Sequence, residues 1–307
     1  MDLRQLAALV AVADAGTFSA AAARLHTVQS NVSTHVARLE RELGAVLVDR
    51  SAGRLTEEGE VVVARARRVQ NELDALTADV ASVGDEVAGR VRMGVIGTTG
   101  RWLVPHLLGA VTTRYPRVRM AVLEGNTTTL LPQLLAGALD LVVVNLPVDD
   151  PDVATDGLFE EDLVLVSPAG HPLAHRDSVD VADLADYDLL LPPPGISIRV
   201  ELDRAAGAAG VVLSAKAELD GLRLIASLAF EGFGAAVLPA SAVPGRGSGA
   251  WRQAPIHHLG RRRVGMARRR RGLPSAPARA LHGVVADVVA RQAATQNGVH
   301  PWSPGTS

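Results

Sequence analysis

The chain has 307 residues, of which 48% are hydrophobic and 21% are charged, and its formal net charge is -2. This length and composition predict a globular protein with two or three domains. Because no cysteine is present, a disulfide framework, a thiolate zinc site and a cysteine nucleophile are all excluded. The opening MDLRQL lacks the cationic and apolar regions of a secretory signal, which favours a cytoplasmic location.

Three helices are predicted in the first part of the chain. The first spans Leu3 to Ala15 and is ended by Gly16. The second is alanine-rich and spans Ser19 to Leu25, and the serine hydroxyl is expected to cap its free amides. The third spans Gln29 to Leu43 after a tight corner. Its apolar residues recur at spacings of four, three and four and share one face: Val32, Val36, Leu39 and Leu43.

The other face of the third helix carries short polar side chains and one long cation. Such groups suit base edges and phosphates in a major groove. The DNA-contacting residues expected here are Gln29, Ser30, Asn31, Ser33, Thr34, His35 and Arg38. A solvated surface helix explains the same pattern when the helix is considered alone.

A small wing is predicted after this helix, with a strand at residues 46–48 and a return at Leu55. Its Arg50 and Arg54 are placed to touch phosphate or the minor groove. Residues 1–59 contain six arginines and seven acidic residues, so the region is not basic by count. DNA binding must therefore depend on where the arginines point and on several copies acting together.

Four segments of this region, with Gln29 between the first two, follow a known order and spacing: MDLRQLAALVAVADAGTFSAAAARLH, VSTHVARLERELG, VLVDR and RLTEEGE. They resemble the winged helix-turn-helix of the LysR-type transcriptional regulators. The chain departs from the family at Val28 and Ser30, where serine and proline are usual, and at Thr34 and His35, where arginine and glutamine are common. These departures leave Thr27 as the expected helix cap and predict a different operator sequence.

A long helix capped by Thr56 is predicted next. Its apolar residues alternate in steps of four and three: Val62, Ala66, Val69, Leu73, Leu76, Val80, Val83 and Val87. Such a seam predicts a two-stranded coiled coil, since a helix lying on a core usually has a wider apolar stripe. The chain is therefore expected to dimerise and to place two reading helices on inverted half-sites.

From Arg90 onward, strands and helices alternate, which predicts α/β lobes with parallel sheets. Predicted strands are VRMGVIG, VRMAVLEG, LDLVVVNLP, DLVLVSP, KAEL and GAAVLP, and a last strand and the helix Ala276–Gln292 return to the first lobe. The expected domains are a winged helix-turn-helix at 1–59, a linker helix at 60–89 and an effector domain at 90–295. Lobe I is placed at about 90–160 and 266–295, lobe II at about 161–265, and a disordered tail at 296–307.

The resemblance extends more weakly to the α/β half, and it implies a co-inducer-binding domain similar in fold to periplasmic solute-binding proteins. Polar groups where strands end at the cleft between lobes are the expected ligand contacts. The effector-binding residues expected from this are Thr98, Thr99, Thr127, Thr128, Asn145 and Ser197. Helix capping by the same hydroxyls is the alternative. Because Asn145 is neutral where some relatives carry arginine, a carboxylate effector is not favoured unless Arg101 or Arg199 supplies the cation.

Two further stretches have a structural interpretation. The arginine-rich stretch 261–271 is interrupted by VGMA and fits a strand with surface charge that returns between lobes. Residues 224–243 are apolar, but the charged Glu231 and several helix breakers favour a buried helix, a glycine turn and a buried strand over a membrane span.

No nucleophile with a base, metal cluster or phosphate loop has supporting spacing, so neither an enzyme nor a metal or other cofactor is expected. The function predicted is a sequence-specific DNA-binding transcriptional regulator controlled by a small-molecule effector between two lobes. Its expected partners are a double-stranded DNA operator, the effector and a second copy through the linker helix. The resemblance adds a homotetramer and contact with RNA polymerase, and no membrane partner is expected. A ligand carrier with a non-functional head is the alternative, against which the absence of a secretory signal speaks.

Overall fold

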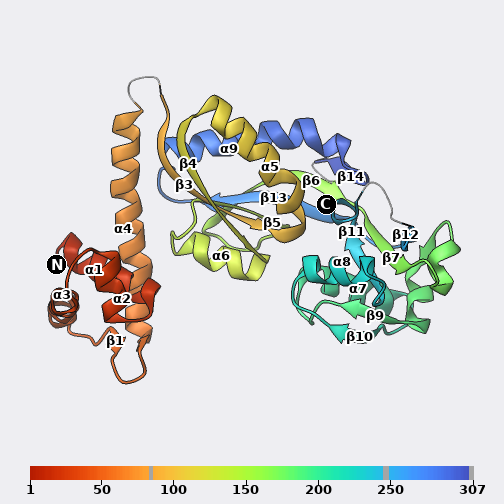
Figure 1. Ribbon diagram of the computed structural model, residues 1–307, viewed down its shortest axis with the longest axis horizontal. Helices are drawn as coiled ribbons and strands as arrows, with labels where there is room; N and C mark the ends of the chain where they lie inside the picture. The colour runs from red at the N-terminus through yellow and green to blue at the C-terminus, as the bar shows by residue number, and fades with distance from the viewer. Residues whose placement is uncertain (83–85, 245–248, 304–307) are drawn as a thin grey trace.

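The computed structural model describes residues 1–82, 86–244 and 249–303. Figure 1 shows a helical head, a long helix beside it and two α/β lobes side by side. The head contains α1 (Leu3–Ala15), α2 (Phe18–Arg24) and α3 (Gln29–Leu43), which share one apolar core. In α3 the buried face is the predicted one for Val32, Val36 and Leu39, whereas Leu43 is exposed.

The caps of two head helices differ from the prediction. α2 begins at Phe18 because the Thr17 hydroxyl, and not that of Ser19, accepts the free amide of Ala20 at 3.2 Å. α3 has no side-chain cap at Val28. The expected Thr27 cap was wrong, since this hydroxyl accepts a hydrogen bond from the Asn31 side chain at 3.0 Å.

The wing consists of the antiparallel strands β1 (Val48–Asp49) and β2 (Arg54–Leu55). Thr56 then caps α4 (Glu57–Ala81) by accepting the amide of Gly59 at 3.0 Å, as predicted. Any side chain at Gly59 would collide with the carbonyl of Leu47, so the wing and α4 can pack this closely only around glycine. The start of α4 is thereby fixed to the head.

The predicted seam divides into two parts along α4. Val62 and Ala66 lie against the head core. Val69, Leu73, Leu76 and Val80 stay exposed. The helix ends at Ala81, so the linker helix is shorter than the expected 60–89: Val87 lies beyond it, β3 begins at Ala88, and Val83 is outside the described residues.

Lobe I is built on a six-stranded sheet in the order β14-β6-β13-β5-β3-β4. Its strands are β3 (Ala88–Ile96), β4 (Arg117–Gly125), β5 (Leu141–Asn145), β6 (Val153–Glu161), β13 (Arg262–Arg269) and β14 (Val299–Pro301). The expected parallel pairing holds for β3 with β4 and β5, but β13 runs antiparallel to β5 and β6. α5 (Gly97–Arg114) and α9 (Ala276–Gln292) lie on one face, and α6 (Thr127–Leu135) lies on the other (Figure 1).

Lobe II has a second six-stranded sheet in the order β10-β9-β11-β7-β12-β8. Its strands are β7 (Leu163–Pro168), β8 (Val179–Asp180), β9 (Asp188–Leu191), β10 (Ser214–Glu218), β11 (Ala235–Pro239) and β12 (Trp251–His257), and its helices are α7 (Ser197–Ala208) and α8 (Leu222–Phe230). Short 3-10 segments are η1 (Pro172–His175), η2 (Val181–Asp186), η3 (Ala240–Ala242) and, in lobe I, η4 (Ala293–Thr295). The apolar stretch 224–243 is the predicted helix, turn and buried strand.

The chain crosses between the lobes twice, as predicted, from β6 to β7 and from β12 to β13. The expectation of a disordered tail was wrong for the described part, because β14 pairs with β6 at Phe159–Glu161. Trp302 then packs so closely on Gly157 that a side chain there would collide with its ring. Backbone pairing and burial of an indole ring are what fix this end of the chain.

Within the described residues, no single helix is both long and apolar enough to cross a membrane. The bent pair α1 and α2, at 116°, passes that test by length and composition only. Both helices contribute to the core of the head.

Candidate nucleic-acid interface and effector site

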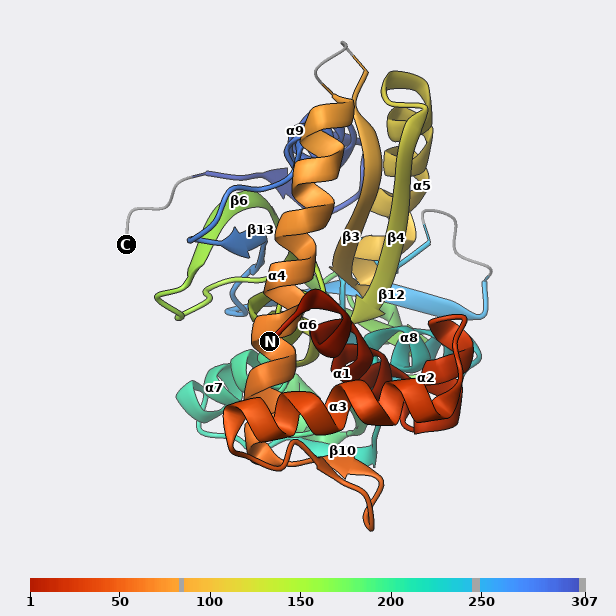
Figure 2. The ribbon, with the colours of Figure 1, turned by 90° about the vertical axis from the view of Figure 1, so that its left-hand side faces the viewer.

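The exposed face of α3 presents most of the predicted reading residues to solvent. Gln29, Ser30, Asn31, Thr34 and Arg38 are exposed, and Ser33 is half-buried. Among the described residues Arg38 forms no hydrogen bond or ion pair, so its guanidinium is available to a partner. Figure 2 shows α3 running across the end of the head with the wing below it.

Two of the predicted reading side chains are less free than the sequence suggests. The Thr34 hydroxyl donates to the Ser30 carbonyl of its own helix at 2.8 Å. The His35 ring is half-buried, and its Nδ1 atom is buried without a partner in the described structure. Both positions therefore offer less to a base edge than their place on the helical wheel predicts.

The wing arginine Arg50 is held in place by three groups of the head. Its Nη1 donates to the Ser33 hydroxyl at 3.3 Å, and its Nη2 lies 3.9 Å from a carboxylate oxygen of Glu40. Its guanidinium carbon lies 5.3 Å from the centre of the Phe18 ring, a distance suited to a cation-π contact. Arg50 is thus oriented toward α3 before any partner binds.

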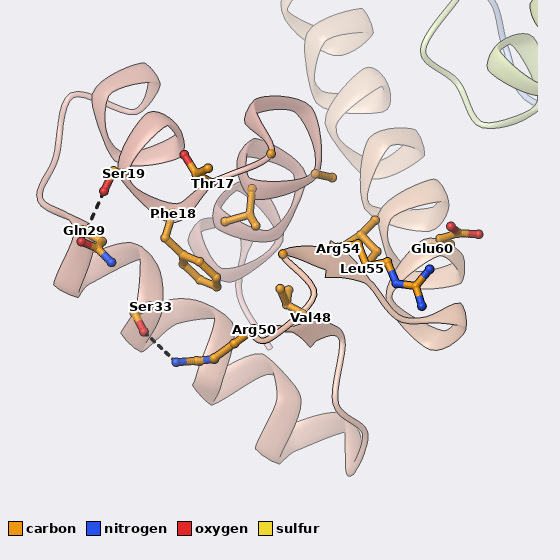
Figure 3. A pocket seen from close by; sticks show the side chains of 14 residues that line it. Thr17, Phe18, Ser19, Gln29, Ser33, Val48, Arg50, Arg54, Leu55 and Glu60 are labelled. Carbon is orange, nitrogen blue, oxygen red and sulfur yellow. Dashed lines mark hydrogen bonds between the residues drawn. The ribbon is translucent and has the colours of Figure 1, made fainter.

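A hollow of about 690 Å³ separates the start of α2, the start of α3 and the wing. Figure 3 shows Gln29, Ser33, Arg50 and Arg54 around it, so four of the nine predicted residues converge on one concave surface. The sequence reasoning missed Thr17, Phe18 and Ser19, which line the same hollow. The Thr-Phe-Ser triplet before the alanine run, with a hydroxyl on each side of an aromatic ring, is the signal that could have located them.

Most acidic residues of the head are engaged in contacts of their own. Asp14 pairs with Arg24 and Arg67, and Glu40 accepts the amides of Leu47 and Val48. Hydrogen bonds from Ser51 and neighbouring amides lower the pKa of Asp49. The bond from the N-terminal ammonium lowers the pKa of Glu42.

These contacts explain how a region with more acids than arginines can attract DNA. Asp14 and Glu42 are paired with cations, and Glu40 and Asp49 fix loops, whereas Arg38 and Arg54 form no hydrogen bond or ion pair in the described structure. Arg38 lies on α3 and Arg54 on the wing, where phosphate contacts position a protein on the duplex.

The predicted effector residues fall into separate groups. Thr98 and Thr99 are buried in the first turn of α5, and their hydroxyls accept from Nη2 of Arg262 at 2.9 and 3.3 Å. The Thr127 hydroxyl accepts the amide of Asn145 at 3.1 Å. Thr128 is exposed and donates to the Asn126 side chain at 2.7 Å.

Ser197, at the start of α7 in lobe II, is exposed and has no partner among the described residues. The structure therefore joins Thr98 to Thr99 and Thr127 to Asn145, but it does not bring Ser197 into contact with them. The Asn145 amide oxygen is buried and unpaired in the described structure. A buried acceptor of this kind is the group most in need of a donor.

The sequence reasoning missed the buried ion pair at the lobe crossing. Arg262 is 8% exposed and Glu161 is 0% exposed. The guanidinium donates through Nε to Glu161 at 2.8 Å, and the other carboxylate oxygen accepts the Ser241 amide of lobe II at 3.2 Å. The surface-charge interpretation of residues 261–271 was thus wrong at Arg262, which pairing with β6 turns inward.

The two alternative cations are also engaged. Arg199 pairs with Asp203 and Glu218, so it carries no free charge. Arg101 of lobe I donates to the Ala242 carbonyl of lobe II at 2.8 Å. Neither residue is a free cation for a carboxylate effector in this arrangement.

Within the described residues, no group of three or more His, Cys, Asp or Glu side chains has a geometry that could hold a metal ion.

A helix-turn-helix head with a wing, joined through a long helix to a two-lobed α/β domain, defines a DNA-binding transcriptional regulator with an effector-binding domain. Family models agree, since residues 3–60 match the bacterial regulatory helix-turn-helix protein, lysR family, and residues 84–290 match the LysR substrate binding domain. The chain belongs to the LysR family. The prediction made from the four head segments is confirmed.

Several relatives share most of the chain. It is 35% identical over 244 residues to the probable hydrogen peroxide-inducible genes activator of Mycobacterium leprae, covering 78% of each chain. It is 32% identical over 249 residues to the DNA-binding transcriptional dual regulator OxyR of Escherichia coli K12, covering 80% of this chain and 81% of OxyR.

Solved structures of two proteins are similar to this chain in fold. A cysteine variant of full-length OxyR from Pseudomonas aeruginosa superposes with a TM-score of 0.77 at 30% identity, covering 99% of both chains. Full-length CbnR in complex with its target DNA has a TM-score of 0.68 at 24% identity, covering 95% of this chain and 100% of that one. The CbnR likeness shows the fold alone.

Proposed function

We propose that the head reads its operator through α3 and anchors on the backbone through the wing. Arg38 contacts guanine or phosphate, Arg50 and Arg54 contact phosphate or the minor groove, and the polar start of α3 contacts base edges. The observation that supports this most is the concave surface on which Gln29, Ser33, Arg50 and Arg54 converge. Thr34 and His35 contribute less, because their polar groups are bonded internally or buried.

The proposed dimer forms through the exposed seam of α4. Four apolar side chains stand free along it: Val69, Leu73, Leu76 and Val80, exposed by 40%, 41%, 62% and 67%. Of the residues by which α4 contacts lobe I, Asn71 lies opposite the seam by the helical periodicity, and Arg68 and Asp79 lie about 100° from it. Docking on lobe I thus leaves the seam available to a second copy.

A second interface, which would make the homotetramer, has support in lobe I and lobe II. β4 is the edge strand of its sheet and exposes Val122 and Leu123, and the nearby helices α5 and α8 expose Leu108 and Leu224. An exposed apolar edge strand favours pairing with another chain. Contact with RNA polymerase and a cytoplasmic site of action follow from the regulator proposal itself.

The effector is proposed to bind without covalent chemistry between the lobes, near Thr127, Asn145 and Ser197. Relatives are named hydrogen peroxide-inducible activators, and solved OxyR chains include cysteine variants. This chain has no cysteine, so a thiol-based response has no counterpart in it. A reversible ligand that favours one arrangement of the lobes is the remaining route to control.

The family is one of regulators and not of enzymes, and we propose that the chain has no catalytic activity. The carrier alternative has no support from the relatives named above, which are described as activators or regulators of genes.

The regulator function is tested by incubating the purified protein with fragments of its own upstream DNA at physiological salt, with excess non-specific competitor, followed by footprinting. We expect protection of a dyad-symmetric site. If a folded, dimeric protein protects no site above random DNA, the operator proposal is wrong.

A further inference from the structure

A cavity of about 290 Å³ lies between α4, the end of α6 and the end of β13, far along the chain from the predicted effector residues. Its charged lining residues are Arg65, Arg68, Glu72, Asp152, Arg269 and Arg271. Four arginines face two carboxylates there, which leaves two positive charges in excess. The views in Figures 1 and 2 show α4 running along lobe I beside α6.

Two of these arginines form the floor of the cavity and bind only backbone carbonyls. Arg68 donates through Nε and Nη2 to Leu135, at 3.2 and 2.7 Å. Arg269 donates through Nη1 to Leu134 and Leu139, at 2.9 and 2.8 Å. These carbonyls lie at the end of α6 and in the loop that follows it. A guanidinium has five N–H donors, so each arginine keeps donors without an acceptor.

The two arginines at the rim are even less engaged. Arg65 is exposed and has no hydrogen bond or ion pair among the described residues. Arg271 is 90% exposed, and its Nε lies 3.8 Å from Asp152, too far for a hydrogen bond. The guanidinium groups of the two floor arginines and the two rim arginines therefore all line the same cavity.

The acids around the cavity offset this charge only in part. Glu72 is exposed and forms no hydrogen bond or ion pair in the described structure, and the Asp140 carboxylate accepts the Arg92 amide at 2.7 Å. Burial raises the pKa of Asp140. Burial also lowers the pKa of Arg269, as do the charges of Arg68 and Arg92, while the charges of Asp140 and Glu72 act in the opposite direction. Arg269 is therefore a half-buried cation that forms no ion pair among the described residues.

We propose that this cavity binds a small multivalent oxyanion, such as a phosphate ester or a polycarboxylate, that bridges the linker helix and lobe I. The volume is close to the lower limit of about 300 Å³ for ligand pockets, which suits a compact metabolite. Because Arg65 and Arg68 come from α4 while Arg269 and Arg271 come from lobe I, an anion between them removes the repulsion across this junction. The bound state therefore favours the docked position of α4.

The test is calorimetric titration of the full-length protein, without DNA, with inorganic pyrophosphate at physiological ionic strength. We expect saturable binding that weakens at least about tenfold in the double variant Arg65→Ala/Arg271→Ala, since two charge-assisted contacts are lost. Neither side chain forms a hydrogen bond in the described structure, so the variant should fold normally.

Two matched controls separate this cavity from general charge effects. Arg119→Ala/Arg263→Ala removes the same charge from other exposed positions, and Arg50→Ala/Arg54→Ala removes the wing cations; both should leave the affinity unchanged within about twofold. Pyrophosphate should also slow amide exchange at residues 134–139 in the wild type and not in the Arg65→Ala/Arg271→Ala variant.

Absence of saturable binding, equal weakening in the Arg119→Ala/Arg263→Ala control, or loss confined to the wing variant would each overturn the proposal. The last result would place the anion on the DNA-binding face. Because the titration contains no DNA, its failure leaves the operator function untouched.

Discussion

The head and the lobe crossing use arginine in opposite ways. In the head, Arg38 and Arg54 are exposed and form no hydrogen bond or ion pair in the described structure, while the carboxylates of Asp14 and Glu40 are engaged elsewhere. At the crossing, Arg262 is buried and shares its donors among Glu161, Thr98 and Thr99. An exposed cation is stabilised by water and can replace counterions on DNA, whereas a buried cation needs a carboxylate beside it. Whether an arginine binds a ligand or stabilises the fold therefore depends on its burial and on the groups beside it.

The largest expected effect comes from breaking the buried pair. Arg262→Ala leaves the Glu161 carboxylate buried without its counter-charge, which should lower the free energy of unfolding by about 3–5 kcal/mol. Urea unfolding measures this change. The double variant Glu161→Leu/Arg262→Met should recover most of the loss, because it removes both charges. A single variant as stable as the wild type would show that the pair is hydrated in solution.

The next effect concerns assembly. Replacing Leu73 and Leu76 by lysine places like charges along the seam of α4 and should give monomers by sedimentation. Ala81→Lys is the control, because Ala81 is exposed on the same helix and lies about 100° from the seam by the helical periodicity. Persistent dimers in the Leu73→Lys/Leu76→Lys variant, with the helix intact by circular dichroism, would refute the proposed coiled coil.

A smaller effect is expected at the reading face. Arg38→Ala should weaken operator binding by about 1–3 kcal/mol while leaving the dimer intact. Arg41→Ala is the matched control, because this exposed arginine donates to the Ala37 carbonyl of its own helix. Competition binding against the footprinted site compares the two. An unchanged affinity for Arg38→Ala would contradict the recognition-helix assignment.

The smallest effect concerns pH and lobe II. His171 Nδ1 accepts the amide of Leu173 at 3.2 Å, and burial lowers the pKa of His171 below its usual value. A lowered histidine pKa contributes stability above about pH 6.5, and this contribution is lost as the pH falls through the folded-state pKa. The midpoint of thermal unfolding should therefore fall between about pH 7 and about pH 5.

The variant His171→Asn keeps an acceptor for the Leu173 amide but does not titrate. Its unfolding midpoint should depend less on pH than that of the wild type over the same range. Identical pH profiles for the two proteins would assign the dependence to other groups.

The sequence predicted the helices α1, α3 and α9 at their observed bounds, because each has clear periodicity and a glycine, proline or serine at an end. The strand β6 was missed because VATDGLFEE is too polar to show a strand pattern, although pairing with β13 and β14 buries its second half. Local chemistry cannot reveal a strand whose neighbours come from distant parts of the chain.

The candidate sites show the same limit. Sequence patterns placed Gln29, Ser33, Arg50 and Arg54 in one DNA-binding region, and these residues line one hollow. This was possible because the four positions lie close together in the sequence, where family spacing and helical periodicity apply. They could not show that the Thr98 hydroxyl accepts a hydrogen bond from Arg262, which lies 164 residues later in the chain. Tertiary pairing, and not propensity, decides which polar groups remain free.

The order of the strands along the chain also determines which lobe can fold first during synthesis on the ribosome. All strands of lobe II come from one continuous stretch between Leu163 and His257, whereas the sheet of lobe I needs β13 at its centre and β14 at its edge. On the ribosome, the head and then lobe II can close while β5 and β6 of lobe I still lack β13 between them. Lobe I is therefore completed last, and a chain that stops before β13 leaves β5 and β6 with open edges that invite aggregation.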